Sequence, residues 1–532
     1  MTGLPTPREA RRLLFWAAPI AFGLVALALG MDADWDLRNY HYYNAWALLS
    51  GRDGWDMLVS QRPSFYNPAL DLPYFLLAQI LPARALAFLY GMLHGLNLVL
   101  LTLLGERLLI LDGAWRRFGL AALLATAGSC GAVALSEIGT VFYDNLLSLG
   151  LFGSLLAVVA HWRRLAEGRR WLVVAVVAGL PAGLAFGLKQ TAVMFPVGLA
   201  VALLLTLPAP PLRRLQVTFA FGIGVVLATI AGGGYWLWHL WAHYGNPIFP
   251  HFNQIFHSPW GLPEAYRDVQ YAVGSPWQRL IFPFTFSFDS KLASEIQFRD
   301  FRVLTAFLLI PVAGLAEVGR VLAGAPPGRR FVDRGPAIFV LVSAAAAYLV
   351  WLLLFAVYRY ITALEMASPL LLALAFGLMP GPHRWRLGLT VGLVMLMVAT
   401  TRFGQWIRVP FTDHAVEVSL PAIADPAHSL VLLAGHEPLS FLLPSFPPAM
   451  RFLRIDSNFT NPDETTVRFN QVMRRIVAEH QGPLLALFIP TERHDVVTRL
   501  GNYGLALDET GCAPVTSPIG AAPYALCPIG RK

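Results

Sequence analysis

Hydrophobic runs long enough to cross a membrane recur along the first three quarters of the chain. They are mostly apolar over roughly 17 to 24 residues each, a length typical of transmembrane helices rather than of barrel strands, which alternate over about 10 residues. A helix also satisfies its own backbone polar groups inside lipid. We predict eleven spans, at roughly 13–31, 83–104, 118–136, 144–160, 171–188, 190–207, 217–240, 303–324, 336–357, 361–380 and 387–403.

Arginines sit in every second connection between these spans. Clusters precede the first span and follow the second, fourth, sixth, eighth and tenth. The positive-inside rule then predicts a cytoplasmic amino terminus, with the loops 32–82 and 241–302 and the tail after 404 on the other side. The basic flank of the first run is typical of a signal peptide, but no small-x-small cleavage site precedes Asp32, so we expect a retained anchor.

Composition agrees with a polytopic membrane protein. Of the 532 residues, 56% are hydrophobic and 14% charged, and the mean hydropathy is +0.55. The net charge of +8 does not indicate nucleic-acid binding, because 37 of the 40 basic residues are arginines that lie mainly between spans. The sequence has no Walker A motif, no dinucleotide fingerprint and no zinc-type spacing of Cys and His.

The tail changes in character. Ser429–Ala434 and Leu484–Ile489 are typical of short buried strands, and Thr465–Glu479 has the apolar spacing of a helix. We predict a membrane domain over 1–403 and a small soluble α/β domain over 404–532. Two of the three cysteines, Cys512 and Cys527, lie in this tail, where an exported domain favours a disulfide; two free thiols are the alternative.

The loop 32–82 has an unusual density of acids, aromatics and amides beside a membrane, with six Asp residues between 32 and 71. Acids there are costly unless they are paired, hydrated or functional. If a helix begins near Asp34–Asp36, then Asp36, Tyr40 and Asn44 share one face. The alternative is that Asp34 or Asp36 only caps that helix.

Four further polar elements are predicted to reach the same membrane face. Each has a structural alternative, such as a turn, a helix cap, a snorkelling lysine or a local ion pair between Arg359 and Glu365. Independent caps would not need to converge on one face. The elements are Tyr66-Asn67-Pro68 to Pro73, Tyr143-Asp144-Asn145, Gly187-Leu188-Lys189 and Tyr358-Arg359-Tyr360 with Glu365.

In this order the elements resemble the GT-C superfamily of polytopic glycosyltransferases, whose relatives include protein O-mannosyltransferases and lipid A aminoarabinose transferases. The matching features are an acid followed four residues later by Tyr in the first outer loop, the Pro-containing segment, a second acid, a lysine and a late Arg-Tyr pair. The stretch GNPIFPHFN is similar to bacterial members. The resemblance covers about residues 10–405. Leu37 stands where many relatives carry Glu, which weighs against a metal-binding first loop.

The resemblance implies an all-α polytopic enzyme of the bacterial cytoplasmic (inner) membrane, with its carboxy-terminal domain periplasmic. It would transfer a sugar, with inversion, from a polyprenyl-phosphate donor to a hydroxyl of a glycan, lipid or protein acceptor. It implies no certain cofactor, and a divalent cation shared by Asp36 and Asp144 is left open. The residues so implied are Asp36 and Asp144 in catalysis and, in substrate binding, Asp34, Tyr40, His41, Asn44, Tyr66, Asn67, Lys189, Arg359, Tyr360 and Glu365.

Two other functions fit the same sequence. A transporter or flippase of a lipid-linked glycan would place charges near the membrane midplane, often in repeated halves, whereas here the polar residues gather at one face. A glycan polymerase or ligase would share the donor and differ in the acceptor.

Overall fold

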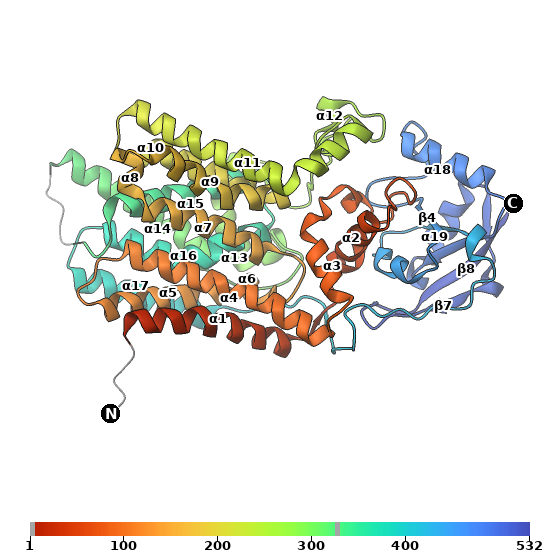
Figure 1. Ribbon diagram of the computed structural model, residues 1–532, viewed down its shortest axis with the longest axis horizontal. Helices are drawn as coiled ribbons and strands as arrows, with labels where there is room; N and C mark the ends of the chain where they lie inside the picture. The colour runs from red at the N-terminus through yellow and green to blue at the C-terminus, as the bar shows by residue number, and fades with distance from the viewer. Residues whose placement is uncertain (1–5, 325–329) are drawn as a thin grey trace.

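The computed structural model describes residues 6–324 and 330–532 and is mostly helical (Figure 1). Each of the eleven predicted spans is occupied by a helix. Seven helical segments of the described chain are long and apolar enough to cross a membrane: 7–29, 83–108, 171–188, 211–244, 302–322, 334–354 and 358–378. The bundle helices are α1 Pro7–Leu29, α4 Ala83–Leu108, α5 Ala114–Ser129, α7 Asp144–Ala160, α9 Trp171–Leu188, α10 Met194–Thr206, α11 Pro211–Tyr244, α14 Arg302–Leu322, α15 Arg334–Leu354, α16 Thr362–Leu378 and α17 His383–Thr400.

The bundle is built around α16, which is buried along nearly its whole length and contacts α5, α7, α14, α15 and α17. Its helices run back and forth between two ends (Figure 1). One end carries residues 404–532, and we call it the domain end. The arginine-bearing connections between α4 and α5, α7 and α9, α10 and α11, and α16 and α17 lie at the opposite end (Figure 1).

Glycines let α9 and α11 pack at close range. A Cβ at Gly179 or Gly183 would lie 2.2 or 2.3 Å from a backbone carbonyl oxygen of α11, and one at Gly224 would lie 1.9 Å from a carbonyl of α9. Small residues four apart are a common device for packing helices in membranes. This contact fixes the carboxyl end of α9, and therefore the position of Lys189, which follows it.

The loop after α1 folds against the domain end. It forms a π-helical turn η1, Leu37–His41, that continues into α2, Tyr42–Leu49, and then α3, Leu72–Ala78. The short strands β1, Met31–Asp32, and β2, Arg408–Val409, pair antiparallel and connect the segment after α1 to the segment after α17. Further short helices are α6 Ala132–Ser136, α8 Trp162–Glu167, α12 Asn253–Phe256 and α13 Pro276–Phe288.

The tail forms the predicted α/β domain. Its sheet has the order β4-β3-β5-β8-β6, with β7 also paired to β8; β3 is parallel to β4 and β5, and β8 is antiparallel to its neighbours. The elements are β3 Leu430–Leu433, β4 Arg451–Arg454, α18 Arg468–Glu479, β5 Leu484–Phe488, α19 Arg493–Gly501, β6 Leu505–Leu507, β7 Ala513–Val515 and β8 Tyr524–Arg531. A disulfide joins Cys512 to Cys527, which confirms the expected pairing.

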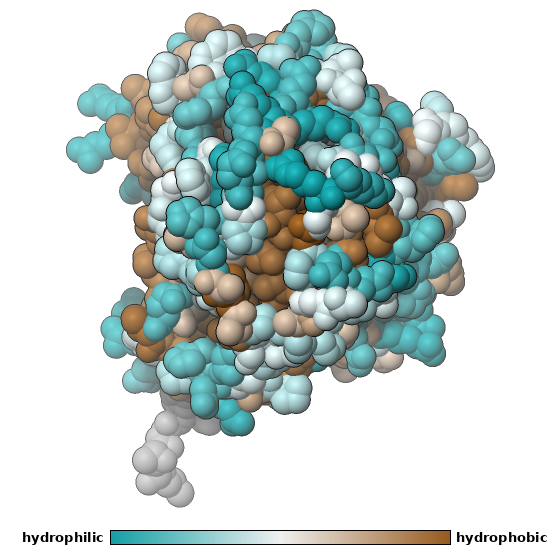
Figure 2. All heavy atoms as spheres, turned by 90° about the vertical axis from the view of Figure 1, so that its right-hand side faces the viewer, coloured by the Kyte–Doolittle hydropathy of each residue, from teal (hydrophilic) through white to brown (hydrophobic). Residues whose placement is uncertain are grey.

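The first loop docks on the edge of this sheet. Met57 accepts a hydrogen bond from the backbone of Arg454 and donates one to Phe452, so the loop extends the sheet beside β4. The buried guanidinium of Arg52 binds Asp56 on its own loop and two carbonyls of the tail, those of Pro448 and Met450. Viewed from the domain end, the surface is largely hydrophilic, with hydrophobic side chains visible in a hollow near its middle (Figure 2).

Candidate functional site

Four of the residues singled out in the sequence meet at the domain end of the bundle. Each comes from a junction where a helix is interrupted: Asp36 at the start of η1, Asp144 at the first residue of α7, Lys189 after α9, and Arg359 in the 3-10 turn Tyr358–Ile361 before α16. Interrupted helices leave side chains free to point between elements instead of along a packed helix face. The four charges form two ion pairs.

Asp36 is buried and bound on one oxygen by two donors. Nη1 of Arg359 lies 2.8 Å from Oδ2, and the hydroxyl of Tyr40 lies 3.2 Å from the same oxygen. The side chain of Asp36 forms no capping hydrogen bond, so the capping alternative does not describe it. The π-turn widens the helix here, as often happens at functional sites.

Lys189 and Asp144 form the second pair. Nζ of Lys189 lies 3.1 and 3.2 Å from the two carboxylate oxygens of Asp144 and donates to the carbonyl of Phe142 at 2.8 Å. The side chains are 17% and 5% exposed. A lysine with three acceptors at this depth is held in place, not snorkelling.

Two aromatic rings connect the pairs. The ring of Phe142 lies 4.8 Å from the guanidinium of Arg359, and the ring of Tyr360 lies 5.4 Å from that guanidinium and 5.6 Å from Nζ of Lys189. Such distances are those of cation–π contacts. The two pairs are therefore parts of one cluster.

The cluster contains competing charges. Burial would raise the pKa of Asp36, but the neighbouring groups, the guanidinium of Arg359 first among them, outweigh burial and hold this pKa below its ordinary value. A carboxylate of Glu295, which the sequence analysis did not single out, lies 3.5 Å from Nε of Arg359 and is 39% exposed. Asp36 is thus held ionised by its neighbours.

Backbone strain accompanies the cluster. Tyr143, directly before Asp144, has φ of +65°, and Ala356, three residues before Arg359, has φ of +56°. Non-glycine residues rarely adopt this left-handed region, and such strain gathers at functional sites. The surrounding packing keeps both junctions in place.

Tyr40, His41 and Tyr66 line the approach from the first loop. The rings of Tyr40 and Tyr66 meet edge to face at 5.5 Å. Nδ1 of His41 lies 2.6 Å from a carboxylate oxygen of Asp71, and its buried Nε2 has no hydrogen-bond partner among the described residues. The turn containing Tyr66 therefore lies against Tyr40, which donates a hydrogen bond to Asp36.

Two side-chain amides that the sequence predicts to bind substrate, those of Asn67 and Asn44, donate hydrogen bonds to backbone carbonyls of the fold. The side-chain amide of Asn67 donates to two backbone carbonyls at 3.0 Å each, that of Gly187 at the carboxyl end of α9 and that of Gly232 in α11. The amide of Asn44 donates to the carbonyl of Pro63 at 2.9 Å. Both residues hold the first loop in its conformation.

Two predicted acids lie apart from the pairs. Glu365 is buried and accepts hydrogen bonds from the backbone of Val133 and Ala134 at the start of α6, so it is not the partner of Arg359. Asp34 is buried beside Asp32, with one carboxylate oxygen lacking a partner among the described residues. Burial, and then the charge of Asp32, raise the pKa of Asp34 well above 3.8.

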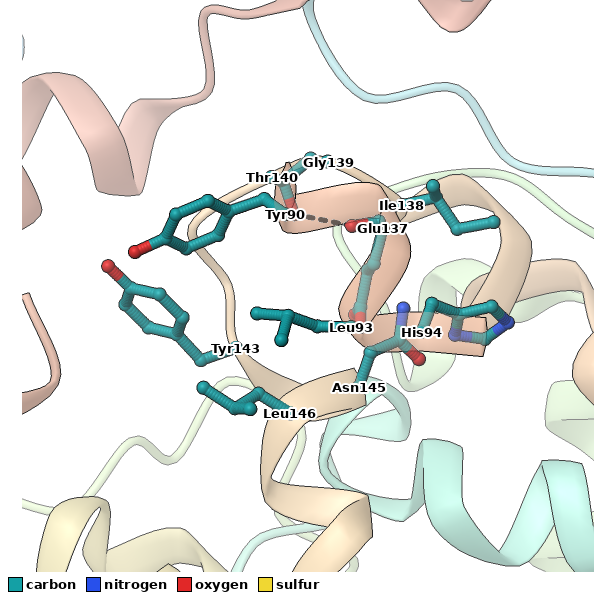
Figure 3. Close-up of a pocket in the computed structure, with 10 residues that line it drawn as sticks. All are labelled: Tyr90, Leu93, His94, Glu137, Ile138, Gly139, Thr140, Tyr143, Asn145 and Leu146. Carbon is teal, nitrogen blue, oxygen red and sulfur yellow. Dashed lines mark hydrogen bonds between the residues drawn. The ribbon is translucent and has the colours of Figure 1, made fainter. Parts of the chain in front are cut away.

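A buried acid missed in the sequence lies behind the cluster. Glu137 lines a cavity of about 20 Å³ together with His94, Tyr143 and Asn145 (Figure 3). Neither carboxylate oxygen has a hydrogen-bond partner among the described residues. Such a volume holds about one water molecule. Glu137 lies in what reads as a plain connection between spans, so no sequence pattern marks it. Within the described ranges, no three His, Cys, Asp or Glu side chains are grouped so that they could hold a metal ion.

No family model and no curated protein matches the sequence. The solved structures that are similar to this chain include the following two. One is the apo oligosaccharyltransferase of Archaeoglobus fulgidus, with 10% identity and a TM-score of 0.46, covering 93% of this chain and 71% of that one. The other is apo ArnT from Cupriavidus metallidurans, with 14% identity and a TM-score of 0.41, covering 98% of both chains.

Proposed function

We propose that the chain is a membrane glycosyltransferase that moves a sugar from a polyprenyl-phosphate donor to an acceptor hydroxyl. The observation that supports this is the cluster of Asp36, Arg359, Asp144 and Lys189 at one end of a membrane bundle. It supplies a buried carboxylate to accept a proton and two cations to bind a phosphate. The polyprenyl tail would lie along the apolar helices.

The two ion pairs suit a phosphate that arrives with the donor. Arg359 and Lys189 carry donor groups that a phosphate recognises, the first as a planar fork and the second as a compact charge. A phosphate that binds Arg359 draws it from Asp36. Because Arg359 is the strongest influence lowering the pKa of Asp36, this exchange raises that pKa and makes Asp36 a better base.

The transfer step then balances in charge and atoms. The acceptor oxygen forms a bond to the anomeric carbon while the bond from that carbon to the phosphate oxygen breaks. The proton of the acceptor hydroxyl passes to Asp36, and the electron pair of the broken bond stays on the phosphate beside Lys189 and Arg359. Asp144 keeps Lys189 in position, and Tyr40 orients Asp36. Inversion follows if the acceptor attacks from the face opposite the phosphate.

The identity of the donor and acceptor can be approached in cells. We expect the glycolipids and glycans of the envelope to lose a sugar when the gene is deleted, as measured by mass spectrometry, and to regain it with the wild-type gene. Asp36→Asn should fail to restore it. Asp413→Asn is the matched control, because Asp413 is an exposed aspartate in the tail whose side chain takes part in no hydrogen bond with a described residue. Full restoration by Asp36→Asn at normal expression would overturn the proposal.

A further inference from the structure

A second cavity lies at the opposite end of the bundle, far from the cluster. It measures about 500 Å³, and its lining residues come from the start of α1, the end of α4, the connection that follows α4 and the first turn of α5. Figure 1 labels these helices. Arg11, Arg107 and Arg117 line it together with Glu106 and apolar side chains such as Ile110. The volume is in the range of pockets that hold small ligands.

The cavity carries uncompensated positive charge. Nε and Nη2 of Arg11 donate to the two oxygens of Glu106 at 2.8 Å each, so these two residues neutralise one another. Arg107 and Arg117 form no hydrogen bond or ion pair with any described residue. The Nε of Arg117 is buried without an acceptor. A buried donor without an acceptor is costly, and an anion in the cavity would supply one.

The surface beside the cavity is apolar and faces outward. Leu13 and Trp16, within two turns of Arg11, are each 65% exposed, and Ile110 and Trp115 are 55% and 45% exposed. Outward apolar residues with tryptophans at a helix end are typical of the membrane interface. A ligand with a phosphate and acyl chains would use both the arginines and this surface.

We propose that this cavity binds the phosphate headgroup of an anionic membrane lipid. Basic pockets between transmembrane helices commonly take such headgroups. The shared chemistry is a phosphate, which a lipid or free inorganic phosphate could supply. The apolar rim favours the lipid. This site is separate from the cluster and does not depend on the proposed transfer reaction.

The test uses the purified, delipidated full chain in a neutral detergent and native mass spectrometry. Phosphatidylglycerol, phosphatidylcholine with the same acyl chains, and inorganic phosphate are added in separate titrations. We expect one retained phosphatidylglycerol, and binding weakened about 30-fold by the double change Arg107→Gln and Arg117→Gln, since each arginine near a membrane surface contributes about a fivefold effect.

Two variants keep the result interpretable. Arg163→Gln with Arg164→Gln removes two exposed arginines from another connection and should bind like the wild type. Arg107→Gln alone changes one exposed side chain and should weaken binding about fivefold even if the double variant does not fold. Equal binding of phosphatidylcholine, equally tight binding of inorganic phosphate, or unchanged binding by Arg107→Gln would each overturn the proposal.

Discussion

The pair of Lys189 and Asp144 allows a structural role to be separated from a role in phosphate binding. Lys189→Met removes both hydrogen bonds that the structure gives to the carboxylate of Asp144, which is 5% exposed. A buried charge left without its partner costs about 3–5 kcal/mol of stability. Asp144→Asn should cost less, about 1–3 kcal/mol, because Lys189 keeps the carbonyl of Phe142 and is 17% exposed.

The double variant closes the cycle. With Lys189→Met and Asp144→Asn together, neither charge of this pair remains, so we expect much of the loss to be recovered and a coupling energy of about 2–3 kcal/mol. The measurement is the free energy of unfolding in mixed micelles of increasing SDS fraction. Additive single effects would refute the claim that the pair is energetically coupled.

The rate of sugar transfer by the same variants shows whether Lys189 also binds the donor phosphate. If Lys189 binds the donor phosphate, the double variant stays inactive although its stability returns. If it transfers sugar at the wild-type rate, Lys189 is only a structural residue. Arg163→Gln, a change in an exposed arginine at the opposite end, serves as the control for loss of a single positive charge.

Three more predictions concern other parts of the chain. Because burial and Asp32 raise the pKa of Asp34, the folded state holds the proton of this carboxyl more tightly than the unfolded chain does. The stability of the fold should therefore decrease as the pH rises from about 4 through the raised pKa. Asp34→Asn should remove this decrease, as measured by thermal unfolding at a series of pH values. Asn67→Ala, which loses hydrogen bonds to two helix carbonyls, should lower the free energy of unfolding by about 2 kcal/mol, and an unchanged stability with lost activity would instead indicate a substrate contact. Reduction of the disulfide between Cys512 and Cys527, separated by 15 residues, should destabilise the tail domain by about 3 kcal/mol, as followed by its sensitivity to protease with and without reductant.

The order of the helices and the small carboxy-terminal sheet domain were readable from the sequence because they depend on local composition. Hydrophobic length predicts a helix whatever it packs against, and arginine placement indicates its direction. The helices differ in detail where the chain is interrupted. α10 begins at Met194 because Lys189 and the 3-10 turn after it stand outside the helix.

The sequence could not predict which charged side chains of the cluster form ion pairs with one another, because the partners are far apart in the chain. The sequence placed Arg359 and Glu365 six residues apart and left their pairing open. The structure turns Arg359 toward Asp36, more than 300 residues away, and turns Glu365 toward the start of α6. Glu137 was missed for the same reason, since its importance depends on what packs around it and not on its neighbours in the chain.

The central claim is that Asp36 accepts the acceptor's proton, and transfer by purified protein tests it most directly. Wild type and Asp36→Asn are placed in vesicles of extracted envelope lipid, with sugar transfer and retained lipid-linked donor measured on the same sample by mass spectrometry. A positioned general base contributes roughly 100- to 10,000-fold, so we predict at least a hundredfold loss of transfer with the donor still bound. A transfer rate within a few fold of wild type would contradict the account.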